Sequence, residues 1–380
     1  MRILAIDISG KVEMYDRALY ESVQSYLSVK DQSCFACPYF TIGDNHSRLR
    51  LWSFIPKRYR NSANLVKRTL KFIEGVINYV VVLTKIKNYD VLHLQWLPFL
   101  EVCSLERHVL KLARKRNPDL KIVLTIHNIY PHNSNQPKQI RYRKRIQTIL
   151  PLIDHVIVHT NSSKDLVCSE FGIQADKVAV IHHGIFVPSY IPQLQRKEDG
   201  KVRILQFGQQ SAYKGTDILI NAIELLDPVT LSQIEVHIIG STNKNLYATY
   251  SAKTQVLPIV WTNNYMSDQD LYQEIQEADL LTYPYRAISQ SGALLLGLYF
   301  KKPVIISDLP SFVETLGQDY PHELICKAGD AQSLADSIRW SVANLSNMQH
   351  VQKTIQHIID TNSWESAANK TIQLYHQLVH

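Results

Sequence analysis

A lysine follows a strand-ending glycine in the second half of the chain. The strand predicted over residues 202–208 ends at Gly208 and Gln209, and Lys214 follows before the next helix. A glycine at that point lets the backbone approach a bound group closely, and the lysine can meet a diphosphate as a point charge. An exposed loop lysine is the alternative interpretation, because most lysines lie in solvent.

A second segment of this half predicts a helix start suited to an anion. The strand predicted over 280–284 runs into Tyr285, Ser289, Ser291 and Gly292, where a helix begins. The first turn of a helix exposes backbone N–H groups, and the helix dipole adds positive potential there. Simple N-capping by either serine explains the same residues. Because both loops follow strands of one predicted sheet, they converge at its carboxyl edge and together predict a phosphate site.

These loops belong to an alternation of strands and helices that runs through the chain. In the first half, strands are predicted over 1–9, 35–42, 90–96, 121–126, 155–159 and 178–181, and helices over 13–28, 102–116, 138–149 and 162–171. In the second half, strands are predicted over 202–208, 234–239, 256–260, 280–284 and 304–307, and helices over 217–225, 268–277, 290–300 and 364–379. Short Val, Ile and Leu runs between helices predict parallel sheets covered on both faces, and hence an α/β fold.

The length and the interruption of this pattern predict two domains. A chain of 380 residues exceeds the size of a single growing core, and the proline-containing polar stretch 186–200 interrupts the alternation. We therefore expect an N-terminal domain over 1–187, a linker over 188–200, a C-terminal domain over 201–363 and a terminal helix over 364–380. The opening segment lacks the features of a signal peptide, and five scattered cysteines do not form a disulfide framework, so a cytoplasmic protein is expected.

Charge is divided unevenly between the halves. Residues 1–180 hold 27 Lys and Arg against 15 Asp and Glu, whereas the whole chain has a net charge of +7. Basic stretches at 57–60 and 67–71 alternate with apolar side chains, a pattern typical of a helix that lies on an anionic membrane surface. A solvated basic face remains the alternative. No nucleic-acid-binding module is visible, so nucleic acid is not an expected partner.

Six segments together resemble one enzyme family. They are FGQQSAYKGTDILINAI, ADLLTYPYRAISQSGALLLGLYFKKPVIISD, VIHHG, DVLHLQW, TIHNIYPH and DHVIVHTNSSKDLVCSEFGI. They resemble retaining family-four glycosyltransferases over most of the chain. The resemblance implies a GT-B fold, with two Rossmann-like domains facing a cleft and a C-terminal helix that crosses back to the N-terminal domain. It also implies sugar transfer from a nucleotide diphosphate sugar to a glycan or lipid-linked saccharide in the synthesis of cell-surface polysaccharides or glycoconjugates.

The resemblance also implies roles for individual residues. Lys214 and the backbone N–H groups of Ser291 and Gly292 would neutralise the donor diphosphate, and Gly208 would let it approach the sheet. His127 would lie near the transferring sugar, where an imidazole can hydrogen-bond a hydroxyl or steady charge during departure. The further donor-binding candidates are Gln209, Tyr285, Ser289 and Glu314. The candidates for the acceptor path or cleft are Gly10, Gln95, Trp96, Asn128, His132 and His183.

The chain departs from the family pattern at two places. The usual Glu-x7-Glu pair falls on Ile288 and Leu296, and a commonly present arginine falls on Gln209; Glu314 is a possible substitute carboxylate. A catalytically silent relative that binds a nucleotide sugar or a partner protein therefore stays open, and an epimerase of the same architecture is a further alternative. No Asp-x-Asp motif or tight histidine cluster predicts a metal site, so neither a metal nor another cofactor is expected.

Overall fold

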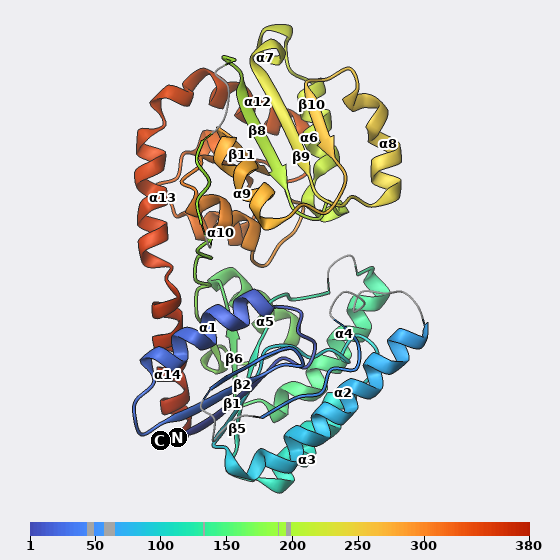
Figure 1. Ribbon diagram of the computed structural model, residues 1–380, viewed down its shortest axis with the longest axis vertical. Helices are drawn as coiled ribbons and strands as arrows, with labels where there is room; N and C mark the ends of the chain where they lie inside the picture. The colour runs from blue at the N-terminus through green and yellow to red at the C-terminus, as the bar shows by residue number, and fades with distance from the viewer. Residues whose placement is uncertain (44–48, 57–64, 132–133, 189, 195–198) are drawn as a thin grey trace. The chain divides into compact units, whose positions relative to one another are not determined.

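The computed structural model describes residues 1–43, 49–56, 65–131, 134–188, 190–194 and 199–380 (Figure 1). The chain divides into two compact units, one formed by residues 1–184 with 363–380 and the other by residues 185–362. The divisions fall after Gly184 and after Asn362, whereas the sequence placed a linker at 188–200 and the last boundary at 363. Residues 185–200 therefore count with the second unit.

The first unit is built on a seven-stranded sheet in the order β3-β2-β1-β4-β5-β6-β7. Its strands are β1 (Arg2–Ile6), β2 (Gln32–Ala36), β3 (Thr41–Gly43), β4 (Val91–Leu94), β5 (Lys121–Thr125), β6 (His155–Val158) and β7 (Val178–Val180). Adjacent strands pair in parallel except β2 and β3, which pair antiparallel. The single strand predicted over 35–42 is thus wrong: the chain reverses at residues 37–40, where Cys37 N donates to Phe40 O at 3.1 Å.

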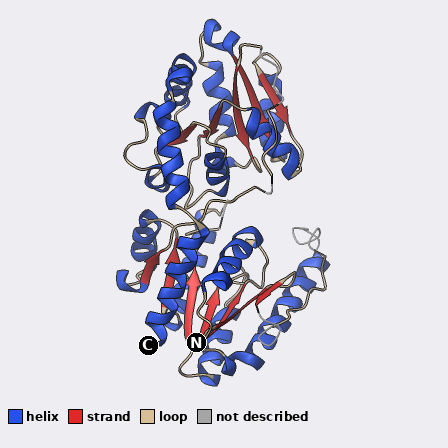
Figure 2. Ribbon diagram, turned by 60° about the vertical axis from the view of Figure 1, so that its left-hand side comes forward, coloured by secondary structure: helices blue, strands red, loops and turns tan. Residues whose placement is uncertain are grey.

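Helices cover both faces of this sheet, as Figure 2 shows. They are α1 (Glu13–Tyr26), α2 (Leu65–Lys85), α3 (Leu105–Arg116), α4 (Gln136–Ile149), α5 (Asn161–Phe171) and α14 (Trp364–Val379). The sequence does set their ends locally: the Asn135 side chain accepts from Lys138 N at the start of α4, and Gly172, at φ +72°, ends α5. The first is an N-cap and the second a left-handed C-cap.

The terminal helix α14 packs beside α1 within the first unit (Figure 1). Three buried side chains join the two helices to the sheet: Tyr375 Oη lies 2.5 Å and Tyr20 Oη 2.8 Å from His93 Nδ1 on β4. Burial lowers the pKa of His93 to about 3, so the ring stays neutral and serves as a hydrogen-bonding link. At its start, α14 places the Trp364 ring where a Cβ on residue 184 would come within 2.4 Å, which explains Gly184.

The second unit is built on a six-stranded, fully parallel sheet in the order β10-β9-β8-β11-β12-β13. Its strands are β8 (Val202–Phe207), β9 (Ile234–Ile239), β10 (Ile259–Thr262), β11 (Leu280–Tyr283), β12 (Val304–Ser307) and β13 (Ile325–Cys326). Its helices are α6 (Thr216–Glu224), α7 (Pro228–Gln233), α8 (Lys244–Thr254), α9 (Asp268–Glu277), α10 (Gly292–Tyr299), α11 (Pro310–Leu316), α12 (Ala331–Asn344) and α13 (Gln349–Thr361). The predicted class of two consecutive parallel α/β sheets is confirmed.

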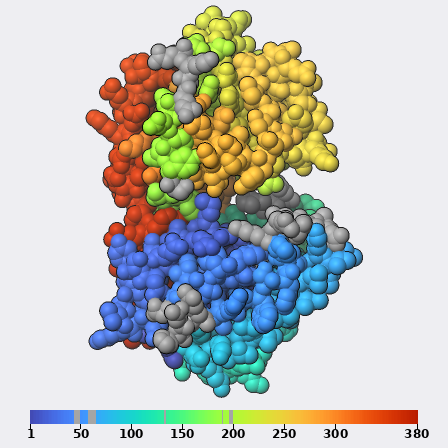
Figure 3. Space-filling model, viewed as in Figure 1, coloured from blue at the N-terminus to red at the C-terminus, as the bar shows by residue number. Residues whose placement is uncertain are grey.

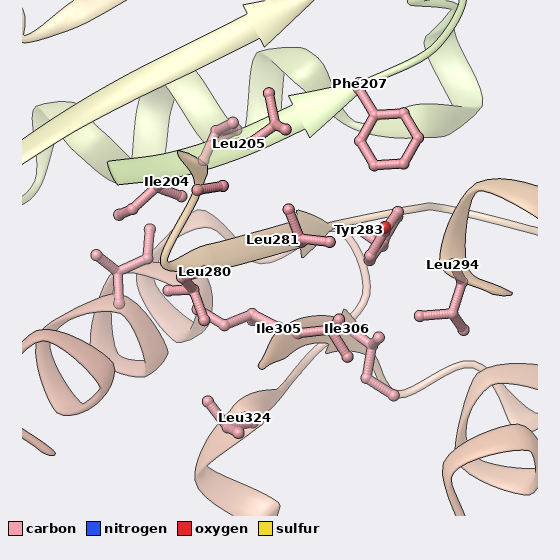
Figure 4. Packing of buried hydrophobic residues seen from close by; sticks show 14 of the residues in the cluster. Ile204, Leu205, Phe207, Leu280, Leu281, Tyr283, Leu294, Ile305, Ile306 and Leu324 are labelled. Atoms are coloured by element: carbon pink, nitrogen blue, oxygen red, sulfur yellow. The ribbon is translucent and has the colours of Figure 1, made fainter. Parts of the chain in front are cut away.

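In the core of the second unit, side chains of the two neighbouring strands pack against β11 (Figure 4). Leu281 and Tyr283 of β11 pack against Leu205 of the neighbouring strand β8 and Ile306 of β12 on the other side. A Cβ at residue 297 would lie 2.4 Å from Tyr283 Oη, so this glycine lets α10 lie close against the strand. The close packing fixes where the N-terminus of α10 points.

Candidate active site

The loop after β8 turns Lys214 back over the end of its own strand. Gly208, at φ +97°, bends the chain out of β8, and the Ala212–Lys214 turn brings the lysine back. Gly215 continues at φ +69°, and a Cβ there would lie 1.9 Å from Pro284 O. Both glycines are therefore required by backbone conformation, and the second also by close approach.

The Lys214 ammonium is buried, and none of the described residues gives it a counter-ion. Its side chain is 6% exposed, its Nζ donates to Phe207 O at 3.3 Å, and Nζ lies 5.1 Å from the centre of the Tyr285 ring. Burial lowers the pKa of Lys214, which the neighbouring Tyr213 partly opposes. Within the described part of the chain no carboxylate pairs with it. A buried ammonium without a paired anion is costly, and such groups gather at functional sites.

The loop after β11 supplies the second half of this site. Tyr285 is 1% exposed, and its ring forms the floor beneath the lysine. Ser291 is the N-cap of α10 and accepts from Leu294 N at 3.2 Å, so the capping role considered from the sequence is present. Gly292 is the first residue of the helix, and Ser289 lies half-buried just before it. The segments that carry the lysine and the helix start thus follow two adjacent strands, β8 and β11.

An arginine that the sequence did not indicate ties these two loops together. Arg286 donates from both terminal nitrogens to Asp217, at 2.8 and 2.6 Å, and also to Ala212 O at 2.8 Å. Its backbone N–H donates to Tyr213 O at 2.7 Å. Asp217 opens α6, 69 residues away in the chain. No local pattern marks such a pair, so only the tertiary structure could identify it.

The remaining donor-binding candidates, Gln209 and Glu314, lie on separate segments of the second unit. Gln209 is exposed, and Glu314 lies partly buried on α11. Ser311 of the same helix donates to Ile288 O at 2.9 Å, which joins α11 to the loop before α10. Ile288 and Leu296, at the positions of the family's carboxylates, pack against the hydrophobic core of the second unit.

In the first unit, His127 follows β5 and lies in an aromatic cluster. Its ring meets Tyr15 edge-on at 4.7 Å between centroids and stacks on Trp96 at 5.8 Å. Its Nδ1 lies 3.2 Å from Nε2 of His159, whereas its own Nε2 is buried and has no hydrogen-bond partner among the described residues. Burial lowers the pKa of His127, and the nearby His159 and His183 lower it further. The ring is therefore neutral at ordinary pH.

The other candidates of this unit lie in different surroundings. Trp96 and Asn128 line the same shallow depression as His127, together with Glu101 and Tyr142. Gln95 lies inside the unit instead of lining a surface: it is fully buried and donates to Tyr20 Oη at 2.8 Å.

His183 is buried behind His159, with Nδ1 donating to Gly184 O at 2.5 Å. Gly10 follows β1 at φ +58°. His132 lies outside the described residues. Across the described ranges, no group of three or more His, Cys, Asp or Glu side chains could hold a metal ion.

A basic and apolar surface lies on α2, which we call the α2 patch. Toward the start of this helix and in the segment before it, the exposed apolar side chains are Trp52, Phe54, Leu65, Val66, Leu70, Phe72 and Ile73. Lys67, Arg68 and Lys71 lie among them, and the light-blue atoms of α2 lie on the surface in Figure 3. The basic stretch 57–60 is outside the described residues. In the part of the chain that the structure describes, no helix has the length and hydropathy needed to cross a bilayer.

Each half of the chain matches a family model of glycosyltransferases. The family model described as Glycosyltransferase Family 4 matches residues 42–187, and that described as Glycosyl transferases group 1 matches residues 201–344. GDP-mannose:glycolipid 4-beta-D-mannosyltransferase of Xanthomonas campestris pv. campestris is 24% identical over 234 residues, which make up 58% of this chain and 62% of that protein.

Solved structures extend the likeness over the full chain. Sucrose-phosphate synthase from Thermosynechococcus elongatus aligns with a TM-score of 0.72 and 16% identity, over 100% of this chain and 99% of its own. Anabaena HepE, solved in complex with UDP and glucose, aligns with a TM-score of 0.68 and 15% identity, over 99% of this chain and 100% of its own. At these identities the structures establish the fold.

Proposed function

Because the chain belongs to the family-four glycosyltransferases of the GT-B fold, we propose that it transfers a sugar from a nucleoside diphosphate sugar to a glycan or lipid-linked saccharide. Such an acceptor would belong to the synthesis of cell-surface polysaccharides or glycoconjugates. The Xanthomonas relative, whose name specifies a glycolipid acceptor, supports this choice.

The buried ammonium of Lys214 is the observation that carries the proposal. It lies at the carboxyl end of β8, over Tyr285, and next to the strand that leads to the N-terminus of α10. A diphosphate at this point would supply the missing counter-ion, and the amides of Ser291 and Gly292 would bind its oxygens. The same charges would stabilise the departing nucleoside diphosphate. No metal ion is needed in this scheme, since lysine and helix amides meet the negative charge.

The donor proposal names two candidates for the nucleotide sugar. The Xanthomonas relative is named for GDP-mannose, and the Anabaena neighbour was solved with UDP and glucose and with UDP-glucose. GDP-mannose is the first choice because it comes from a sequence relative. We expect retention at the anomeric carbon, as the family resemblance implies. The relative's name specifies a β-linked product, so the anomeric configuration of the product must be measured directly.

The α2 patch supports a place for the enzyme at the cytoplasmic face of a membrane. Exposed apolar side chains among lysines and arginines suit the boundary between lipid headgroups and acyl chains. A lipid-linked acceptor would be presented at that surface. The protein would then be peripheral, bound by charge and by partial burial of its apolar side chains.

The test is a thermal-shift comparison of nucleotides followed by a transfer assay. A ligand at 100 times its dissociation constant adds about 2.7 kcal/mol of stability. GDP and GDP-mannose, or UDP and UDP-glucose, should raise the melting temperature, and the corresponding nucleoside monophosphates should act more weakly because they leave the lysine unpaired. NMR of the transferred sugar then gives its anomeric configuration.

Two outcomes would reject parts of the proposal. No shift with any nucleoside diphosphate or nucleotide sugar would remove the diphosphate site. A clear shift with neither transfer to saccharide acceptors nor donor hydrolysis would favour a silent binding protein. Ile288 and Leu296, in place of the two carboxylates, are the observation that favours that second candidate.

A further inference from the structure

We propose that His159 is a positioning residue that holds His127 in its Nδ1–H form, so that the Nε2 lone pair of His127 is a hydrogen-bond acceptor for a sugar hydroxyl. The identity of the ligand as a sugar rests on the proposed function. The protonation pattern of the two rings does not, because it follows from contacts within the first unit.

The donors and acceptors in this pair of histidines can be assigned from a backbone carbonyl. Ile181 O can only accept, and His159 Nδ1 lies 3.0 Å from it, so that nitrogen carries the proton. Burial lowers the pKa of His159 to about 4, so the ring is neutral and its Nε2 has a lone pair. His127 Nδ1, 3.2 Å from this lone pair, must be the donor. A neutral imidazole has one N–H, and therefore Nε2 of His127 carries none.

Packing holds both rings in the orientation that this pattern requires. His159 is 4% exposed at the end of β6, and Ile181 follows β7, the neighbouring strand of the sheet. Tyr15 of α1 lies 4.7 Å from the His127 ring and 5.3 Å from the His159 ring. Turning the His159 ring over would place a carbon atom against Ile181 O and lose that bond.

The unpaired nitrogen decides which ligand group His127 can serve. His127 Nε2 is buried and has no partner among the described residues, and buried nitrogen atoms in this state require a partner or a functional explanation. An unprotonated nitrogen accepts from O–H groups and repels phosphate or carbonyl oxygens, which are acceptors themselves. Of the two roles that the sequence left open, this arrangement favours binding a hydroxyl over stabilising negative charge as an imidazolium.

The surroundings of the ring fit a saccharide hydroxyl. Trp96 and Asn128 line the same depression as His127, so an indole ring and an amide lie beside a group that enters it. Lys11 Nζ lies over the Trp96 ring at 4.5 Å and pairs with Glu101 at 3.2 Å. In this proposal, the hydroxyl that reaches His127 supplies the hydrogen bond that Nε2 lacks among the described residues.

The first experiment reads the tautomer without any sugar transfer. Protein labelled with 15N-histidine gives long-range 15N–1H correlations that distinguish a protonated Nδ1 from a protonated Nε2. The His127 signals are assigned from the spectrum of His127→Gln. We expect His127 to be Nδ1–H with an unprotonated Nε2 near neutral pH. A protonated Nε2 in the parent protein would overturn the proposal.

A matched pair of variants then tests the role of His159. His159→Gln keeps an acceptor oxygen near the place of Nε2, whereas His159→Phe keeps a ring but removes that acceptor. In the phenylalanine variant we expect His127 to lose the Nδ1–H form, and kcat for transfer to fall at least tenfold, with nucleoside diphosphate affinity within twofold of the parent. The glutamine variant should retain the tautomer and recover most of the lost rate.

The outcomes separate this proposal from the proposed function. An unchanged His127 tautomer in a folded His159→Phe variant would refute the positioning role, whatever the activity. If that variant does not fold, the parent spectrum still decides, because a protonated Nε2 on His127 would refute the positioning role. A parent protein that shows the expected tautomer but transfers no sugar would reject the proposed function and leave the positioning role intact.

Discussion

Replacing Lys214 by methionine should separate ligand binding from stability. The substitution keeps most of the apolar stem and removes the ammonium. In the parent, that ammonium is 6% exposed, has one hydrogen bond of 3.3 Å to a neutral carbonyl, and has no described carboxylate beside it. The charge thus lowers the stability of the ligand-free protein and contributes favourably only when an anion is bound.

The expected size of the binding effect follows from the contact that is lost. A charged hydrogen bond contributes about 1.5–3 kcal/mol. At 1.4 kcal/mol for each factor of ten, Lys214→Met should weaken nucleoside diphosphate binding about 10- to 150-fold. Turnover should fall as well, because the same charge would stabilise the leaving group.

The stability effect should have the opposite sign. The pKa of Lys214 is lowered in the folded protein, so the unfolded chain binds this proton more tightly. The resulting penalty is fully present below the lowered pKa and disappears as pH rises through it toward the ordinary lysine value. Without ligand, Lys214→Met should therefore be at least as stable as the parent near neutral pH, and the difference should shrink in alkaline buffer.

Calorimetric titration with nucleoside diphosphate and thermal unfolding against pH measure the two effects. Lys253→Met is the matched control, since Lys253 is in the same unit but its side chain is 41% exposed and pairs with Glu224 at 2.6 Å. The control should change both quantities by less than about 1 kcal/mol. Parent-like diphosphate affinity in Lys214→Met would refute the diphosphate site, and a clear loss of ligand-free stability would refute the claim that the ammonium is uncompensated.

Three further predictions concern the Arg286–Asp217 ion pair, the independence of transfer from metal ions, and membrane binding by α2. Arg286→Gln and Asp217→Asn should each weaken diphosphate binding several-fold, because both release the loop that carries Lys214. The double variant should lose no more affinity than either single variant, since the two changes break the same ion pair. A loss of affinity in the arginine variant alone would show direct contact between Arg286 and the ligand. Sugar transfer should survive EDTA, and complete loss restored by magnesium or manganese would contradict the scheme. Replacing Lys67, Arg68 and Lys71 by glutamine should weaken binding to anionic vesicles by up to about 1 kcal/mol per residue, as measured by sedimentation; unchanged binding would leave α2 as an ordinary solvated face.

The sequence predicted the alternation of the fold because buried parallel strands leave a strong local pattern. Strand β12 and helices α9 and α14 have their predicted ends, each set by nearby residues such as the Ser267 and Ser363 caps. Strand β10 begins three residues after its predicted start, because exposed Val256 continues the apolar run without joining the sheet. Helices α7, α8, α11, α12 and α13 and strand β13 were missed.

Some residues of the candidate site could be named from local sequence, and others required the tertiary structure. Lys214 and Ser291 could be found because glycine, lysine and serine stand in a recognisable order beside two strands. Arg286 could not be found, since its partner Asp217 is distant in the chain. The buried place of Gln95 also required the structure: a polar residue at a strand end can face solvent or join an internal network, and Tyr20 supplies that network here.

The return of the chain to the first unit has a consequence for how the protein is made. Residues 185–362 form one continuous segment inserted within the first unit, and the last helix, α14, supplies Tyr375 to the network of Tyr20 and His93. Domains generally fold as units while the ribosome extends the chain. The inserted unit therefore has all its residues before the unit that precedes it does. Premature termination before Ser363 would leave a complete second unit attached to a first unit that lacks its closing helix.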